Sequence, residues 1–137
     1  MDCKDLTIGD YVKYNGITKI VDAVYLYSVS VHDPSEEWSI SEAKTYSVDD
    51  IEPIKLTEDI LVKNGFRYTA NVIGRHNCKC YELGQKGVYH MTISIYKNEI
   101  TCELDKVDAM YMNVITNCVH ELQHLLRLAG IEKSIEL

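Results

Sequence analysis

The segment His120-Glu121-Leu122-Gln123-His124 places two imidazoles four residues apart, with a carboxylate next to the first. On a helix, histidines at this spacing lie on one face and can bind the same Zn²⁺ ion, and the adjacent Glu can act as general base on a zinc-bound water. One interpretation of the chain is therefore a zinc-dependent metallohydrolase, with His120 and His124 as metal ligands and Glu121 as the base.

A catalytic zinc ion needs a third protein ligand, and the chain offers no clear one. No histidine follows His124, and the acidic residues after it are Glu132 and Glu136, so an upstream ligand would have to be His90 or His76. A helical wheel also places both histidines of the motif opposite the apolar stripe of their helix, on the face expected to be exposed to solvent. We therefore predict a solvated helix face, no catalytic residue, and no metal or other cofactor.

A second group of residues could bind an anionic aromatic ligand such as a nucleotide. Arginine offers a bidentate fork for phosphate, and an aromatic ring offers a stacking plane. Arg67 and Arg75 flank a predicted strand, close to Tyr68 and His76, and Trp38 belongs to a segment that can fold over it. We predict that these five residues bind the ligand, in a pocket between two subdomains or across a symmetric dimer. Taken singly, each arginine could instead pair with a nearby glutamate on the surface.

The segment His76-Asn77-Cys78-Lys79-Cys80 holds two cysteines two residues apart, which point to one face of a strand. Together with His76 they could supply three soft ligands to a metal ion. The segment lacks the second cysteine pair of the usual zinc knuckles, so two buried thiols beside a turn are the favoured interpretation. The five cysteines are an odd number without a secretory context, and we expect them to be reduced.

Length and composition limit the classes of protein to which the chain can belong. With 137 residues, 46% of them hydrophobic and 26% charged, it resembles one ordinary globular domain or two small subdomains. The 14 basic and 21 acidic residues give a formal net charge of −7, which disfavours nucleic-acid polymers and anionic membrane surfaces as partners. No basic and apolar leader and no membrane-length apolar run is present, so we expect a cytoplasmic protein.

Residues 1–55 are expected to form a small SH3-like β-barrel. Asn15-Gly16 is a strong signal for a hairpin turn, and residues 17–27 are rich in β-branched and aromatic side chains. After a polar loop, two further short strands are predicted at residues 38–40 and 45–48. Several short strands in so short a segment are typical of small barrels.

Residues 56–137 are expected to form an α+β subdomain. Thr57 can cap a short helix that runs through Asn64, and Gly65 suits the left-handed conformation that ends it. Antiparallel strands are predicted over residues 67–73, 78–83, 89–96 and 99–104, with a tight turn at Lys97-Asn98. Gly84-Gln85-Lys86-Gly87 is a flexible loop between strands, because a P-loop would end in Gly-Lys-Ser/Thr and precede a helix.

The C-terminal region shows a helical pattern of apolar residues. At about 100° per residue, one stripe contains Tyr111, Ile115, Cys118, Val119, Leu122, Leu126 and Ala129. This pattern predicts an amphipathic helix over residues 111–129 that is ended by Gly130, followed by an edge strand or a tail over residues 131–137. The predicted fold class is therefore α+β: a small SH3-like β-barrel followed by an antiparallel β-meander packed by a C-terminal amphipathic helix.

Four segments of the sequence resemble a family of small proteins found in gut Bacteroides-type bacteria and in the phages and prophages that they carry. The segments are Ile8-Gly9-Asp10-Tyr11-Val12, Ile51–Leu61, Asn64-Gly65-Phe66 and Val119–Leu125. The last segment of the family is similar to Val-His-x-Leu-Gln-Asn-Leu, so His124 stands where the family commonly has Asn. The resemblance thus implies a helix that works without two histidines, and it implies a phage-associated accessory role without a particular activity.

These observations favour a noncatalytic phage or prophage accessory protein that binds and sequesters a small nucleotide-type ligand, as a counter-defence protein would. A protein-binding inhibitor of a host factor is an alternative, because the chain is acidic and contains ten tyrosines that suit interfaces. The zinc metallohydrolase is a third interpretation. The expected partners are therefore a nucleotide-type small molecule or a host protein, with no nucleic-acid polymer and no membrane, and a homo-oligomer would suit a pocket shared by two copies.

Overall fold

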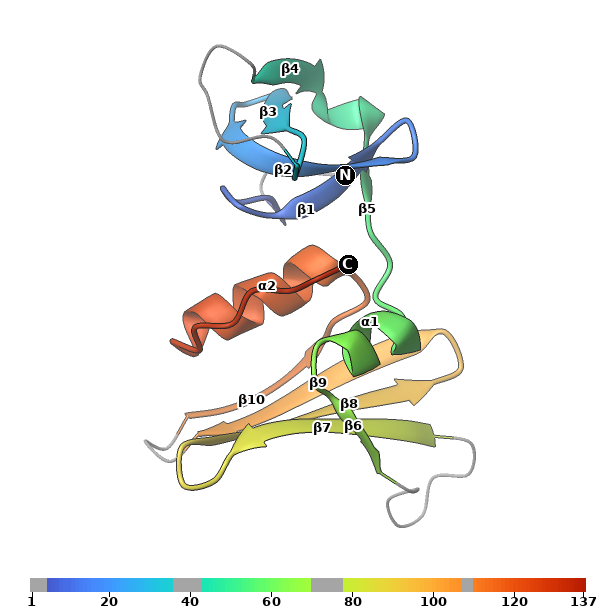
Figure 1. Ribbon diagram of the computed structural model, residues 1–137, viewed down its shortest axis with the longest axis vertical. Coiled ribbons are helices and arrows are strands. Elements are labelled where there is room, and N and C mark those ends of the chain that lie inside the picture. Colours follow the sequence, from blue (N-terminus) through green and yellow to red (C-terminus); the bar gives the residue numbers. More distant parts are fainter. Residues whose placement is uncertain (1–4, 36–42, 70–77, 107–109) are drawn as a thin grey trace. The chain divides into compact units, whose positions relative to one another are not determined.

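The computed structural model of the chain describes residues 5–35, 43–69, 78–106 and 110–137. Within these residues, two antiparallel sheets and two α-helices make the chain an α+β protein, which confirms the predicted class (Figure 1). The chain divides into two compact units. The first unit comprises Met1–Lys55 and Cys118–His120, and the second comprises Leu56–Asn117 and Glu121–Leu137.

The first unit contains a five-stranded sheet in the order β4-β3-β2-β1-β5. The strands are β1 (Tyr11–Tyr14), β2 (Ile17–Val24), β3 (Ser28–His32), β4 (Lys44–Ser47) and β5 (Ile51–Pro53), with a 3₁₀ turn η2 (Val48–Asp50) before β5. The edge strands β4 and β5 do not pair with each other, so the described sheet is not closed into a barrel. The strand predicted at residues 38–40 lies outside the described residues.

Local sequence signals account for much of the first unit. Asn15 and Gly16 take positive φ angles of 49° and 76° and form the two-residue turn that pairs Tyr14 with Ile17, as predicted. Tyr14 also stacks on Tyr46, with 3.8 Å between the ring centroids. The buried apolar core contains Leu6, Val12, Val21, Val29, Val31, Val48 and Ile51.

The second unit contains a five-stranded sheet in the order β10-β9-β8-β7-β6. The strands are β6 (Arg67–Thr69), β7 (Cys78–Gln85), β8 (Tyr89–Tyr96), β9 (Glu99–Lys106) and β10 (Met110–Ile115). Helix α1 (Glu58–Lys63) and most of helix α2 (Val119–Leu128) lie over one face of this sheet (Figure 1). Along β8 and β9, polar side chains alternate with buried apolar ones. The polar side chains therefore lie on the face that the helices do not cover.

The predicted boundaries of the first helix are confirmed. The Thr57 hydroxyl accepts a hydrogen bond from the Ile60 amide at 3.3 Å, and Gly65 follows the helix with a positive φ of 84°. Asn64 at the C-cap is buried, and its side chain also holds the C-terminal tail: Nδ2 donates to the Glu136 carbonyl at 2.7 Å, and Oδ1 accepts from the Glu136 amide at 2.8 Å. Residues 131–137 are therefore an anchored tail and form no strand.

The helix predicted over residues 111–129 is wrong in its first part. Met110–Ile115 is strand β10, which pairs with β9 from Met110 opposite Lys106 to Ile115 opposite Thr101, and the helix begins only at Val119. The helical spacing of apolar residues did not decide the structure here, because β9 supplies the backbone of β10 with a continuous set of hydrogen-bond partners. Secondary structure in this segment is fixed by a tertiary contact.

Candidate functional site

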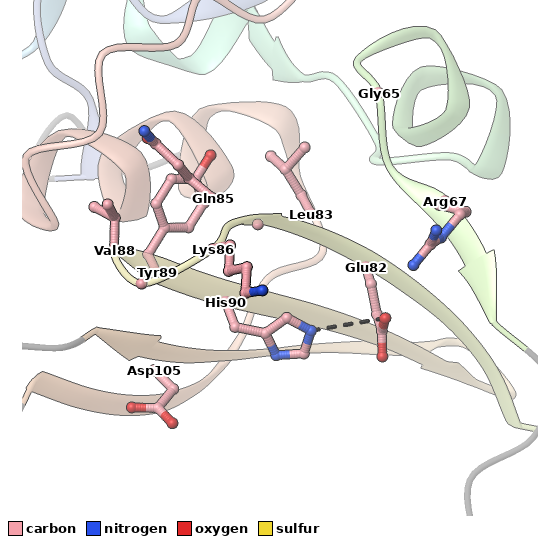
Figure 2. A pocket seen from close by; sticks show the side chains of 12 residues that line it. Gly65, Arg67, Glu82, Leu83, Gln85, Lys86, Val88, Tyr89, His90 and Asp105 are labelled. Atoms are coloured by element: carbon pink, nitrogen blue, oxygen red, sulfur yellow. Dashed lines mark ion pairs between the residues drawn. The ribbon is translucent and has the colours of Figure 1, made fainter.

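A cavity of about 580 Å³ lies in the second unit (Figure 2). It is formed by the β7–β8 hairpin, the start of β6 with the glycine before it, and one residue of β9. The lining residues are Gly65, Arg67, Glu82, Leu83, Gly84, Gln85, Lys86, Gly87, Val88, Tyr89, His90 and Asp105. Its volume falls within the range of small-molecule sites in proteins.

The register of the hairpin brings the polar residues of the cavity together. Strands β7 and β8 pair up to Gln85 opposite Tyr89, and the Val88 amide donates a hydrogen bond to the Gln85 carbonyl at 2.9 Å across the turn. Gly84 lies opposite His90, and the imidazole is close above it: a Cβ added at Gly84 would be 3.4 Å from the His90 Cδ2 atom. The missing side chain at Gly84 therefore leaves room for the ring of His90.

Basic and acidic side chains both line the cavity. Arg67 lies opposite Glu82 across β6 and β7, and His90 lies opposite Asp105 across β8 and β9. His90 Nε2 is 3.7 Å from Glu82 Oε2, an ion pair when the imidazole is protonated (Figure 2). Within the described ranges, the guanidinium of Arg67 and the ammonium of Lys86 form no ion pair. Two cations at this cavity are thus available to an anionic ligand.

The structure separates the residues that were predicted to bind a ligand. Arg67 lines the cavity, whereas the next residue, Tyr68, projects to the other face of β6 because side chains alternate along a strand. Tyr68 instead packs edge to face against Tyr81, with 5.5 Å between the ring centroids. The other predicted residues, Trp38, Arg75 and His76, lie outside the described part of the chain.

The sequence interpretation did not assign Glu82, Lys86 and Asp105 to the cavity, and it considered His90 only as a metal ligand. The feature that could have placed these residues together is the pairing register of the β7–β8 hairpin. Once Gln85 and Tyr89 are paired, residues 82, 84 and 90 must share one face. The loop predicted at residues 84–87 begins too early, because Gly84 and Gln85 belong to β7 and the turn occupies residues 86–88. The closing pair of the hairpin could not be chosen without the neighbouring strands.

The histidine motif lies on helix α2, but its environment differs from the prediction. His120 is buried, with 4% of its surface exposed, and Glu121 and His124 are half-buried. The predicted solvated face is therefore wrong for His120. The reason is that buried positions cover more than half of the helix circumference and are not confined to one stripe; they are Val119, His120, Leu122, Gln123, Leu125, Leu126 and Ala129.

Among the residues that the structure describes, no third zinc ligand lies beside this motif. In residues 5–35, 43–69, 78–106 and 110–137, no three His, Cys, Asp or Glu side chains gather so that they could hold a metal ion. Two of the predicted soft ligands, Cys78 and Cys80, do share one face of β7, and both are buried. His76, the third member of that group, is not among the described residues.

Titratable groups with shifted pKa values lie away from the cavity. The Glu58 carboxylate accepts a hydrogen bond from Lys79 at 2.9 Å, and this bond raises the pKa of Lys79. Burial, followed by the charge of Glu58, raises the pKa of Tyr81. Burial also raises the pKa of the Cys102 thiol to about 12. These groups belong to the packed side of the sheet and its core.

None of the described helices is both long enough and apolar enough to cross a membrane.

No family model matches the sequence, and neither a curated protein nor a solved structure gives a match.

Proposed function

We propose that the chain is a noncatalytic binding protein that captures a small anionic ligand of nucleotide type in the cavity of its second unit. The observation that carries this proposal is the presence of two cations, Arg67 and Lys86, that line the cavity and form no ion pair within the described residues. An arginine fork and a lysine ammonium at one cavity suit a phosphate group.

The remaining lining residues suit the rest of such a ligand. Gln85 and Asp105 offer hydrogen-bond donors and acceptors for a base or sugar, and Tyr89 offers an aromatic ring. His90 is positioned beside Glu82 and adds a third nitrogen group that can contact an anion when it is protonated. A ligand with one anionic end and one polar ring would use both kinds of group.

A thermal-shift screen with cyclic di- and trinucleotides and ADP-ribose-type compounds tests the proposal. A ligand at a hundred times its Kd stabilises the native state by about 2.7 kcal/mol. We expect a rise in Tm with at least one compound, and we expect Arg67→Ala and Lys86→Ala to abolish it. Arg127→Ala removes an exposed arginine of α2 outside the cavity and should leave the shift unchanged.

Two outcomes would overturn this assignment. One is the absence of a shift with every compound of the panel. The other is a shift that is as large in Arg67→Ala and Lys86→Ala as in the wild type. If Arg75→Ala alone abolished the shift, the ligand would be bound through the second predicted arginine and not through Arg67 and Lys86.

We further propose that the first unit is related to SH3-like barrels. Its strand order, β4-β3-β2-β1-β5, keeps sequential neighbours together and returns β5 to the side of β1. A register shift between Val21 and Ala23 bends the long strand β2, and the 3₁₀ turn η2 leads into β5. Bends of this kind are what a short sheet needs in order to curl toward closure.

Inhibition of a host protein is a second candidate function, and one feature of the first unit favours it. Tyr25, Leu26 and Tyr27 lie between β2 and β3 with 55%, 74% and 76% of their surfaces exposed. Consecutive exposed aromatic and aliphatic side chains suit a protein interface. If this function holds, a host protein that co-purifies with the wild type should be lost with Leu26→Ser and Tyr27→Ser but retained with Arg67→Ala.

The biological setting of either function is proposed from the resemblance to the phage-associated family alone. A small accessory protein of that kind would act in the cytoplasm of the host by stoichiometric binding. Sequestration of a nucleotide signal used in antiviral defence would then be the sharpest form of the proposed function. The thermal-shift panel includes the cyclic nucleotides that such a role requires.

A further inference from the structure

The C-terminal tail, residues 131–137, brings a lysine to the edge of the cavity in the second unit. Gly65 and Leu83 both line the cavity, and a Cβ atom added at Gly65 would lie 3.9 Å from Leu83 Cδ1 and 4.0 Å from Lys133 Nζ. All three residues belong to the second unit. The ammonium of Lys133 therefore lies beside Gly65, at the wall that Gly65 and Leu83 form.

The backbone of the tail is held on both sides of Lys133. Before it, the Ile131 amide donates a hydrogen bond to the Leu126 carbonyl of α2 at 2.8 Å. After it, the backbone of Glu136 forms two hydrogen bonds with the Asn64 side chain, at 2.7 and 2.8 Å. The fold thus sets the position of the Lys133 backbone. A ligand in the cavity can then be reached by movement of the flexible four-carbon stem alone.

The charge of Lys133 is available at this edge of the cavity. In the part of the chain that the structure describes, its ammonium forms no ion pair. The end of helix α1 does not need it either, because carbonyls of the last turn already accept hydrogen bonds from the backbone amides of Asn64, Gly65 and Phe66.

The charge balance of the cavity makes an additional cation important. The lining residues that are ionised at neutral pH are two cations and two carboxylates: Arg67, Lys86, Glu82 and Asp105. With His90 neutral, these four charges cancel, so the lining alone does not attract an anion over a distance. The ammonium of Lys133 gives the cavity a net charge of one positive unit.

We propose that Lys133 is a ligand-binding residue of this cavity and that the ligand carries two linked phosphate groups, as a nucleoside diphosphate or an ADP-ribose-type compound does. This inference rests on the proposed function. Figure 2 shows Gly65 and Arg67 on one side of the cavity and Lys86 on the other. Arg67 and Lys86 suffice for one phosphate group, and Lys133 beside Gly65 supplies a contact for a second.

The two carboxylates of the cavity suit the sugar of such a ligand. Glu82 and Asp105 are hydrogen-bond acceptors only when ionised, and they would repel a phosphate group. The hydroxyl groups of a ribose can donate hydrogen bonds to them. A ligand with a diphosphate next to a sugar therefore provides a partner for the acidic and the basic side chains of the lining.

The test compares inorganic pyrophosphate with inorganic phosphate as probes, by isothermal titration calorimetry of the full-length chain in buffer without divalent cations. We expect the wild type to bind pyrophosphate about tenfold more tightly than phosphate. Lys133→Gln should raise the Kd for pyrophosphate about fivefold and the Kd for phosphate by less than about twofold, because only the second phosphate group loses a contact. The matched control is Lys44→Gln, which removes the same charge from an exposed strand position of the first unit and should leave both Kd values unchanged.

A purely structural role of Lys133 would change a different measurement. Lys133→Gln would then lower the Tm without ligand and leave the Kd for pyrophosphate as in the wild type, and this result would overturn the inference. Equal weakening of phosphate and pyrophosphate binding in Lys133→Gln would also overturn it. A wild type that binds phosphate as tightly as pyrophosphate would do the same.

Protection from acetylation tests Lys133 on the wild-type protein, without any substitution. Saturating pyrophosphate should protect Lys133 and Lys86 from acetylation, as seen by peptide mapping, while the modification of Lys44 is unchanged. Equal acetylation of Lys133 with and without pyrophosphate would contradict the inference.

Failure of this inference is distinguishable from failure of the proposed function. If Arg67→Ala and Lys86→Ala lose pyrophosphate binding while Lys133→Gln keeps it, the cavity binds its anion without the tail, and only the inference is wrong. If the wild type binds neither probe and no compound of the thermal-shift panel, the proposed function fails, and the inference fails with it.

Discussion

Gly84 and His90 are direct partners across the β7–β8 hairpin, and a methyl group at Gly84 would lie 3.0 Å from the Tyr89 carbonyl oxygen and 3.4 Å from the His90 ring. The first contact is with backbone and cannot be relieved by a rotamer change. We expect Gly84→Ala to lower the free energy of unfolding by about 1 kcal/mol and to displace His90.

Urea denaturation measures the loss of stability in Gly84→Ala, and the thermal-shift panel measures the loss of nucleotide-type binding. A variant with the wild-type denaturation midpoint and wild-type ligand response would show that the ring of His90 tolerates a neighbour, and that the empty position at Gly84 has no role in the cavity.

Asn64 is predicted to hold the C-terminal tail. Its side-chain amide bonds both backbone groups of Glu136 and also donates to the Ile60 carbonyl at 2.8 Å. We expect Asn64→Ala to lower the free energy of unfolding by about 2 kcal/mol, because three hydrogen bonds are lost and the tail loses its attachment to the end of α1. Hydrogen exchange at the Glu136 amide should accelerate. Asn98→Ala, at an exposed turn, is the control, and equal effects of both substitutions would refute the anchoring role.

Cys102 should make stability decline at alkaline pH. Burial raises the pKa of its thiol from 9.0 to about 12, so the folded state retains a proton that the unfolded chain releases. Unfolding therefore becomes easier as pH rises from about 9 toward 12, and the full contribution of this thiol to stability is present below pH 9. Urea midpoints measured from pH 7 to 10.5 should fall less steeply in Cys102→Val. Parallel curves for the two proteins would contradict this.

Lys106 closes the C-terminal end of helix α2. Its Nζ donates a hydrogen bond to the Ala129 carbonyl at 2.7 Å, where helix carbonyls lack partners within the helix. We expect Lys106→Met to destabilise the protein by about 1 kcal/mol, with the methionine keeping most of the apolar stem. Lys44→Met, on an exposed strand position, should be neutral in the same thermal unfolding experiment. An unchanged Tm in Lys106→Met would show that water replaces the lysine.

The sequence was most informative where the structure depends on a few adjacent residues. The hairpin at Asn15-Gly16 and the caps of α1 at Thr57 and Gly65 follow from local backbone preferences and are confirmed. The segment Met110–Ile115 was assigned to a helix because its strand pairing depends on β9, which its own pattern of apolar residues does not reveal.

The candidate site was less accessible from the sequence for the same reason. Arg67 was chosen for its chemistry, and it does line the cavity, but Tyr68 had to face the other way once β6 was a strand. Glu82, His90 and Asp105 come from three strands and meet only through the register of the sheet. Interpretation of His120 required knowledge of everything that packs on α2, which a helical wheel of one helix cannot supply.

The turn that joins Gln85 to Tyr89 carries a constraint on length. Because faces alternate at every residue, one insertion or deletion between these two positions would rotate His90 to the packed side of the sheet and bring an apolar neighbour to the cavity. The residue types in the turn can therefore vary among related chains more freely than the number of residues in it. Related chains that share this site should therefore vary in the composition of the turn while keeping its size.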